Sequence, residues 1–484
     1  MTERGTHRWP SRRPDVLIVH TDQWRWDALG CLGSPVKTPH VDALAAAGVH
    51  FDHAVVQSPV SMPSRISLLT GRYPSNLGIT HMGVPVPESV ETLATMLRRR
   101  GWLTANIGKL HFRPHANRDH SETHPDYGFD VLQLSDEPGV YEDDYKAWVR
   151  SVAPEEVDNI SIGLPPAAVV WRQLMGGSGP FPAAMPPDDG PREDFDGPHV
   201  FGADAGLTHS AWVADRVLDH LAGLPADQPS FCIANFFSPH PPFYVPQQYL
   251  DLYDPAEMPL PALDAAEIEA QRGGLLTDDR LRAIRHGYYA SISECDHHMG
   301  RILAGLRQLG REEHTLVVLL SDHGEWLGDH LRLSKGYPAD DPVSRVPLII
   351  RWPAGILEPG RRMTDIVELL DLAPTILEAS GIPVPPTVQG RSLMPALKGQ
   401  PLDRTAVALT EHEHWTSVRT PQHHYVLHAD GRELLWDLIE DPTEHVELTA
   451  QGGRGVDLAL AGIRHLLLTR QLEARRALPR TYPY

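Results

Sequence analysis

Short apolar runs alternate with stretches of helical spacing along most of the chain. Residues 15–20 and 315–321 are apolar runs of the length expected for strands buried on both faces of a sheet. Residues 278–309 place apolar side chains three and four positions apart, which predicts one long helix with a continuous apolar stripe. Further strands are expected at residues 104–107, 231–237 and 347–352, and shorter helices at residues 41–47 and 90–100, the second capped by Ser89. Strands that alternate with helices predict an α/β fold with a large mixed, mostly parallel sheet between layers of helices.

The pattern changes along the chain and predicts three parts. Residues 1–13 are expected to form a flexible arm, residues 14–395 the large α/β domain, and residues 400–484 a smaller α/β domain. In the last part, short apolar runs separated by turns predict an antiparallel sheet with strands at residues 415–419, 424–428 and 433–437. Residues 155–208 are rich in Pro, Gly and Asp, which predicts a long loop over the core. The run Glu-His-Glu-His at residues 411–414 is interpreted as a solvated edge or the rim of a pocket rather than a metal site.

The composition excludes several classes of protein. Of the 484 residues, 41% are hydrophobic and 22% are charged, which is the balance of a globular protein and not of a disordered chain. The 43 Lys and Arg residues against 63 Asp and Glu residues give a net charge of −20, so neither nucleic acid nor an anionic membrane is expected as a partner. An anionic substrate would therefore need a local cationic site.

Three further features of the sequence favour a cytoplasmic location. No apolar run approaches the ~18 residues of a membrane span. The basic N-terminal segment is followed by too short an apolar stretch for a signal peptide. Cys31, Cys232 and Cys295 are widely spaced, which suits a reducing compartment and gives no disulfide framework. We expect a cytoplasmic enzyme, and a homo-oligomeric state is left open.

The densest chemical signal is the segment from Ser58 to Arg72. Pro63 suits the first turn of a helix and Gly71 its end, so Ser61 is expected at the helix N-terminus. The free backbone N–H groups and the positive end of the helix dipole favour an anion there. Arg65 follows four residues later on the same face, and a hydroxyl beside a guanidinium is suited to attack on a sulfate or phosphate ester. The alternative is an ordinary serine-capped helix with a surface arginine.

This segment closely resembles the signature of the sulfatase family, within the alkaline phosphatase superfamily. Other segments match the family's motifs in order along the chain: Asp22-Gln23, Gly108-Lys109-Leu-His111, Tyr127-Gly-Phe-Asp130, Pro239-His240-Pro-Pro242, Ser321-Asp322-His323-Gly324 and Lys335 before the apolar run at 345. The resemblance spans about residues 14–395, and the tail is similar to the family's small C-terminal sheet domain. It implies an alkaline-phosphatase-like fold and hydrolysis of a sulfate ester.

Two pairs of residues at strand ends predict a metal site. Asp22 and Asp322 each follow an apolar run, so both are expected at the carboxyl edge of the sheet, where α/β enzymes bind ligands. With Gln23 and His323 they form a mixed oxygen and nitrogen donor set for one divalent cation. Ser61 is counted with the residues of the predicted metal site because the metal would lower the pKa of this candidate nucleophile. The family implies Ca²⁺, and the histidine would also admit Mn²⁺.

The remaining matched residues are assigned roles around the ester. Lys109 and Lys335 would hold its non-bridging oxygens as point charges, beside Arg65. His111 and His240 are the candidate general base and general acid, because imidazole titrates near neutral pH. The expected substrate is a small anionic ester.

Position 61 departs from the commonest family pattern, in which a cysteine is oxidised to formylglycine. Three interpretations of Ser61 are open. A radical maturase could convert it to formylglycine, as in some bacterial sulfatases, and the maturase would then be a partner. The serine could act unmodified on a phosphorus ester. It could also be an engineered replacement that stalls a cysteine enzyme.

Two other departures leave the substrate class open. Gln23 replaces the second acid of many sulfatases, and His323 stands where Asn is frequent. Both resemble the branch that includes phosphonate and phosphate ester hydrolases, so a phosphonate monoester or phosphodiester hydrolase is the alternative function. A second alternative is a non-catalytic homologue that kept the anion pocket and lost its nucleophile.

Overall fold

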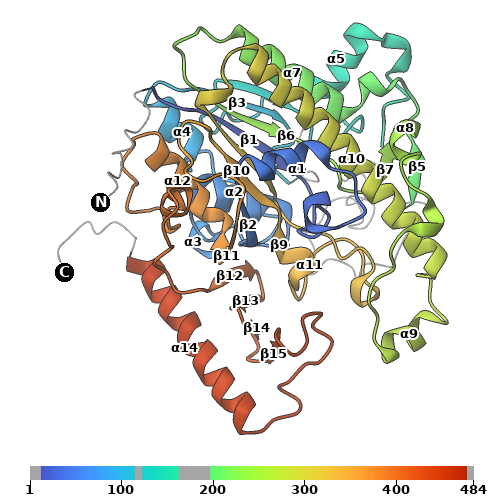
Figure 1. Ribbon diagram of the computed structural model, residues 1–484, viewed down its shortest axis with the longest axis vertical. Helices are drawn as coiled ribbons and strands as arrows, with labels where there is room; N and C mark the ends of the chain where they lie inside the picture. Colours follow the sequence, from blue (N-terminus) through green and yellow to red (C-terminus); the bar gives the residue numbers. More distant parts are fainter. Residues whose placement is uncertain (1–11, 115–122, 163–196, 477–484) are drawn as a thin grey trace, which may run out of the picture.

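The computed structural model describes residues 12–114, 123–162 and 197–476. The expected arm at residues 1–13 therefore lies almost entirely outside the described residues, as does most of the expected loop at residues 155–208. Among the described residues, nine strands form one sheet in the order β11-β2-β10-β8-β1-β6-β3-β4, with β9 paired to β2 (Figure 1). Their bounds are β1 Asp15–Thr21, β2 Val49–Val55, β3 Leu103–Gly108, β4 Val131–Leu134, β6 Ser230–Asn235, β8 Thr315–Ser321, β9 Arg345–Val346, β10 Leu348–Arg351 and β11 Arg361–Glu368.

The centre of this sheet is parallel, as the sequence predicts. β1 pairs in parallel with β8 and with β6, and β3 pairs in parallel with β6 and β4. β10 runs antiparallel to both β8 and β2, which makes the sheet mixed. Every residue of β1 and β8 is buried, which explains why Val16 to Val19 and Leu316 to Leu320 inside these strands are apolar without alternation.

Helices cover both faces of the sheet and create two separate cores. Successive residues of a strand point to opposite faces, so Leu17 and Val19 of β1 join one core while Val16 and Ile18 join the other. The first core also receives α1 Pro39–Ala46, α7 His209–Gly223 and α10 Asp278–Gln308. The second receives α2 Ser61–Thr70, α4 Leu93–Arg98 and α12 Leu372–Ala379. The fold is thus the predicted α/β sandwich.

Shorter elements fill the connections. The helices are α3 Pro74–Leu77, α5 Asp144–Val152, α8 Gln247–Leu250, α9 Ala265–Gln271, α11 Asp341–Ser344 and α13 Met394–Leu397. The strands β5 Pro198–Val200 and β7 Phe243–Val245 form a separate parallel pair. A short 3₁₀ turn, Asp329–Leu331, lies on the loop between β8 and α11.

The C-terminal part contains the predicted antiparallel sheet, followed by a long helix. The sheet has the order β12-β13-β14-β15, with bounds Ala408–His412, Trp415–Arg419, His423–His428 and Glu433–Asp437. The helix α14, Arg454–Arg476, lies along this sheet at one end of the molecule (Figure 1). Ile463 and Leu467 of α14 pack with Val418 and Leu435 of the sheet and with Leu370 of the large domain. The domain boundary near residue 400 stays a prediction.

One local expectation was wrong, and a second, the solvated edge at residues 411–414, holds for the exposed Glu413 and His414 but not for Glu411. Ser89 does not cap the helix expected at residues 90–100, because that helix begins at Leu93 and its cap is Thr92, whose hydroxyl accepts the Thr95 N–H. Thr92 also donates to the Tyr127 carbonyl, a tertiary contact that fixes it as the cap. In the run at 411–414, Glu411 is buried and accepts hydrogen bonds from the Ser75 N–H and hydroxyl, so it is not solvated.

A buried ion pair fastens α14 to the large domain. Arg470 donates to the Glu368 carboxylate at 2.9 Å, and their side chains are 4% and 0% exposed. Glu368 also accepts from the Tyr73 hydroxyl at 2.7 Å and the Leu409 N–H at 3.0 Å. Glu368 is therefore a single acceptor shared by three segments.

Arg470→Ala should lower the free energy of unfolding by about 3 kcal/mol, because it leaves the Glu368 carboxylate buried without its cation. Arg464 of the same helix is the matched control: its pair with Glu433 is half exposed, so Arg464→Ala should cost less than about 1 kcal/mol. Urea unfolding of both variants measures the difference, and equal losses would contradict this role of Arg470.

Candidate active site

The predicted site residues lie at the carboxyl ends of adjacent parallel strands. Asp22 follows β1 and Asp322 follows β8, and these strands are neighbours in the sheet. Lys109 follows β3, whose neighbour β6 ends at Asn235. All four side chains are buried, with exposures of 3% or less. Parallel pairing brings segments of the chain that lie far apart to one edge of the sheet.

Ser61 is the first residue of α2, directly after the extended Val60. Pro63 stands in the first turn, and Gly71 ends the helix in the left-handed conformation with φ 65°. The Ser61 hydroxyl lies 3.0 Å from Nε2 of His323 and 3.4 Å from Nζ of Lys335. The helix thus presents the candidate nucleophile to both the predicted metal site and a predicted cationic residue.

Arg65 binds the carboxylates of the site. Its Nε donates to Asp322 at 2.7 Å and its Nη2 to Asp22 at 3.2 Å. Nη1 donates to the Lys109 carbonyl and to Oδ1 of Asn235 at 3.1 and 3.0 Å. The guanidinium is 2% exposed, so in this structure it holds acids in place rather than facing an ester. Burial would raise the pKa of Asp322, but the Arg65 charge lowers it to about 2.

Lys109 and Lys335 occupy different positions in the site. Lys109 Nζ lies 2.6 Å from Asp22 Oδ2, and this ammonium holds the pKa of Asp22 well below its usual range despite burial. Lys335 Nζ donates to Nε2 of His240 at 3.0 Å. His240 donates through Nδ1 to the Pro241 carbonyl at 2.6 Å. Burial and the Lys335 charge lower the pKa of His240 well below its usual range, so the imidazole is neutral here.

His111 lies in the loop that follows β3. Its backbone has a left-handed φ of 53°, and its N–H donates to Oδ1 of Asp136 at 2.9 Å. The same Asp136 oxygen accepts the Leu110 N–H at 2.8 Å. Asp136 thereby fixes the loop that carries both Lys109 and His111.

The donor atoms of Asp22, Asp322 and His323 lie within 4.8 Å of one another. His323 donates through Nδ1 to the Gly324 carbonyl, which leaves the lone pair of Nε2 directed to Ser61 and the carboxylates. Burial lowers the pKa of His323 to about 4, so the ring is neutral as a metal ligand must be. Among the described residues, Asp22 Oδ1 and Gln23 Oε1 are buried without a hydrogen-bond donor. These unpaired oxygens beside an imidazole nitrogen whose lone pair faces them fit a divalent cation.

Residues 14–382 match the family model described as Sulfatase, and residues 337–453 match the model for the C-terminal part of N-sulphoglucosamine sulphohydrolase. The chain belongs to the sulfatase family. An arylsulfatase of Clostridium perfringens is 28% identical over 473 residues, which cover 90% of each chain. The multifunctional alkaline phosphatase superfamily protein PehA of Trinickia caryophylli is 30% identical over 429 residues, 81% of this chain and 78% of that protein.

Solved structures confirm the alkaline-phosphatase-like fold of this sulfatase-family chain. The phosphonate monoester hydrolase of Agrobacterium radiobacter superposes with a TM-score of 0.78 at 26% identity, over 96% of both chains. That of Silicibacter pomeroyi has a TM-score of 0.76 at 26% identity, over 95% of this chain and 96% of that one. Within the described ranges, no helix is both long and apolar enough to cross a membrane.

Two supporting residues of the sulfatase site were missed by the sequence analysis. Asn235 holds the Arg65 guanidinium; it lies inside the strand expected at residues 231–237, and only the structure shows that the strand ends at Asn235. Glu325 accepts a hydrogen bond from Nε2 of Gln23, and this contact turns Oε1 of Gln23 away from the Glu325 carboxylate. The Glu325 carboxylate also accepts the Leu327 N–H at 3.0 Å. Glu325 lies three residues after Asp322, but no motif indicated its role.

Asp322→Asn should abolish stabilisation of the protein by its site cation, because it removes half of the carboxylate charge at the site. At a concentration 100 times its Kd, Ca²⁺ or Mn²⁺ should raise the free energy of unfolding of the parent by about 2.7 kcal/mol. Thermal unfolding after chelation, with each cation added back, measures this. Asp430→Asn, in an exposed turn, is the matched control, and a similar gain in both variants would place the cation elsewhere.

Proposed function

We propose that this protein hydrolyses a monoanionic sulfate ester through residue 61. The observation that carries the proposal is the position of the Ser61 hydroxyl at the N-terminus of α2, 3.0 Å from His323 and 3.4 Å from Lys335. Membership of the sulfatase family supports the reaction class. A hydroxyl held between a cationic side chain and a metal-ligand set is arranged for attack on an anionic ester.

The charges of the site favour such a substrate. The site holds three cations against two carboxylates: Arg65 and Lys109 pair with Asp22 and Asp322, and Lys335 contacts Ser61. A divalent cation held by Asp22, Gln23, Asp322 and His323 would supply Lewis acidity at the ester oxygen and lower the pKa of the residue 61 hydroxyl. The site is therefore electropositive inside a chain of net charge −20, and it attracts an anion at short range.

Lys335 and His240 form the proton-bearing side of the proposed site. Lys335 donates to both the Ser61 oxygen and Nε2 of His240, so its ammonium spans the nucleophile and the candidate general acid. His240 is neutral in this arrangement and accepts a hydrogen bond from the Lys335 ammonium. An anionic ester bound to Lys335 would weaken the effect of that charge on His240 and favour its protonated, acid form.

Residue 61 has two candidate chemical forms. As formylglycine, formed when a radical maturase removes two hydrogens from the serine, its hydrate would attack sulfur with one hydroxyl and expel sulfate with the other. As serine, it would attack directly and form an ester with the enzyme. The mass of the peptide that contains residues 61–65 distinguishes the two forms, because oxidation removes two hydrogens.

Hydrolysis of a phosphonate monoester or phosphodiester is the second candidate function. It is favoured by Gln23 and His323 and by the likeness to two phosphonate monoester hydrolases. Both substrate classes carry a single negative charge next to the scissile bond, so the charges of the site do not separate them.

Parallel assays of an aryl sulfate, a phosphonate monoester, a phosphodiester and a phosphate monoester test the proposal. We expect the sulfate to have the highest kcat/KM, and a thousandfold preference corresponds to ~4 kcal/mol of transition-state stabilisation. A preference for the phosphorus esters would replace the first function by the second. Ser61→Ala is the control for background hydrolysis, and parent activity no higher than this variant's on every ester would support a non-catalytic homologue.

Lys109→Ala and Lys335→Ala should each lower kcat/KM on the best substrate by ~2–4 kcal/mol, because each removes a charge beside the ester. Lys398→Ala is the matched control, since Lys398 pairs with Glu378 outside the site and its loss should leave kcat/KM unchanged. Thermal unfolding of each variant separates a catalytic loss from a folding defect. Values within threefold of the parent for both site variants would show that the anion binds elsewhere.

A further inference from the structure

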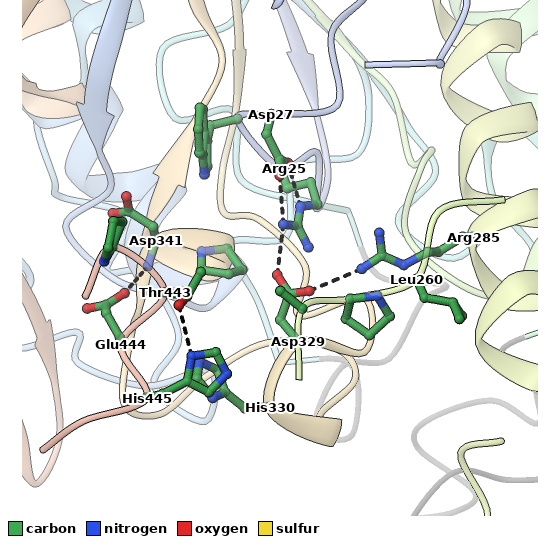
Figure 2. Close-up of a pocket in the computed structure, with 15 residues that line it drawn as sticks. Arg25, Asp27, Leu260, Arg285, Asp329, His330, Asp341, Thr443, Glu444 and His445 are labelled. Atoms are coloured by element: carbon green, nitrogen blue, oxygen red, sulfur yellow. Dashed lines mark hydrogen bonds and ion pairs between the residues drawn. The ribbon is translucent and has the colours of Figure 1, made fainter. Parts of the chain in front are cut away.

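Outside the candidate active site, two histidines from distant segments meet at the carboxylate of Glu267. Glu267 of α9 accepts from Nδ1 of His330 at 2.8 Å through one oxygen and from Nε2 of His445 at 3.0 Å through the other. His330 lies on the 3₁₀ turn Asp329–Leu331, and His445 follows the small C-terminal sheet. The two imidazole rings lie side by side with centroids 4.7 Å apart (Figure 2).

The chemistry of this cluster is that of a transition-metal site. Two imidazoles and one carboxylate are a donor set that Zn²⁺ takes with a fourth ligand from water. The three donor atoms lie within 4.8 Å of one another, so small side-chain rotations would bring them to a common ion. The three side chains are only 13–18% exposed. His330 and His445 also line a cavity of about 280 Å³, which has room for the water ligand (Figure 2).

A second observation concerns the other nitrogen of each imidazole: that of His445 has a hydrogen-bond partner, and that of His330 faces a carboxylate at a longer distance. Nδ1 of His445 lies 2.8 Å from the Thr443 hydroxyl, and Nε2 of His330 lies 3.8 Å from Oδ2 of Asp340. Histidines that bind a metal through one nitrogen almost always direct the other N–H to such a partner. A metal bound at the nitrogens that face Glu267 would leave the nitrogens that face Thr443 and Asp340 to carry the N–H group of each ring.

We propose that Glu267, His330 and His445 bind one divalent ion of the zinc class, separate from the cation site at Asp22 and Asp322. The ion joins α9, the loop that carries Lys335 and the C-terminal segment, three parts of the chain that the sheet itself does not connect. Its role is structural, because none of its ligands contacts Ser61 in the described contacts.

The test measures Zn²⁺ bound at equilibrium to the full-length chain after chelation and dialysis, with a chromophoric chelator as competitor. Glu267→Gln and His445→Ala should each bind one equivalent of Zn²⁺ fewer than the parent. His414→Ala should bind as much as the parent, because His414 is an exposed histidine of the same C-terminal part. Since the readout is a difference from the parent, zinc bound at the Asp22–Asp322 site cancels.

A second measurement uses Co²⁺ as a spectroscopic substitute. Visible absorption of four-coordinate Co²⁺ with nitrogen ligands should appear with the parent and be lost in Glu267→Gln, a variant of nearly the same shape that keeps a hydrogen-bond acceptor. Circular dichroism verifies that each variant is folded. Equal Zn²⁺ stoichiometry in the parent and Glu267→Gln would overturn the proposal and leave the cluster as two histidines hydrogen-bonded to a carboxylate.

Discussion

The contact between the Arg65 guanidinium and the carboxylates of Asp22 and Asp322 is the one on which the rest of the site depends. Two fully buried carboxylates at adjacent strand ends lose their hydration and repel each other, and such charges are tolerated only when a cation and hydrogen bonds compensate them. Arg65 supplies both the positive charge and the hydrogen bonds, at 2.7 Å from Asp322 and 3.2 Å from Asp22. Because Ser61 lies one turn earlier on the same helix, the contact that neutralises the acids also positions the candidate nucleophile.

Burial then sets the charge state of each imidazole around this centre. His323 stays neutral and keeps a lone pair for a cation, while neutral His240 accepts a hydrogen bond from Lys335 and holds that ammonium beside Ser61. The carboxylates stay charged because Arg65 and Lys109 outweigh their desolvation. Burial therefore keeps these two histidines uncharged while the neighbouring cations keep the acids ionised, which is the combination that a divalent cation requires of its ligands.

Most of the fold could be predicted because its pattern is local. The run at 315–321 matches β8 in full and the stripe at 278–309 matches α10 within one residue, since buried strands and long amphipathic helices show in the sequence itself. The errors fall where a tertiary contact overrode local preference. Thr92 replaces Ser89 as the cap through its bond to Tyr127, and Glu411 is drawn into the interior by Ser75 of a distant helix.

The sequence by itself determined the family, the sheet between helices and the residues that follow its strands. These features depend on residues that are neighbours in the chain, so they can be recognised without the tertiary structure. Only the tertiary structure decided what those residues contact. Arg65, expected beside the ester, instead binds acids that lie 43 and 257 positions away. Glu267 meets His330 and His445 across 63 and 178 positions. Such contacts depend on how the sheet and the C-terminal part place their loops, and no local spacing encodes that distance.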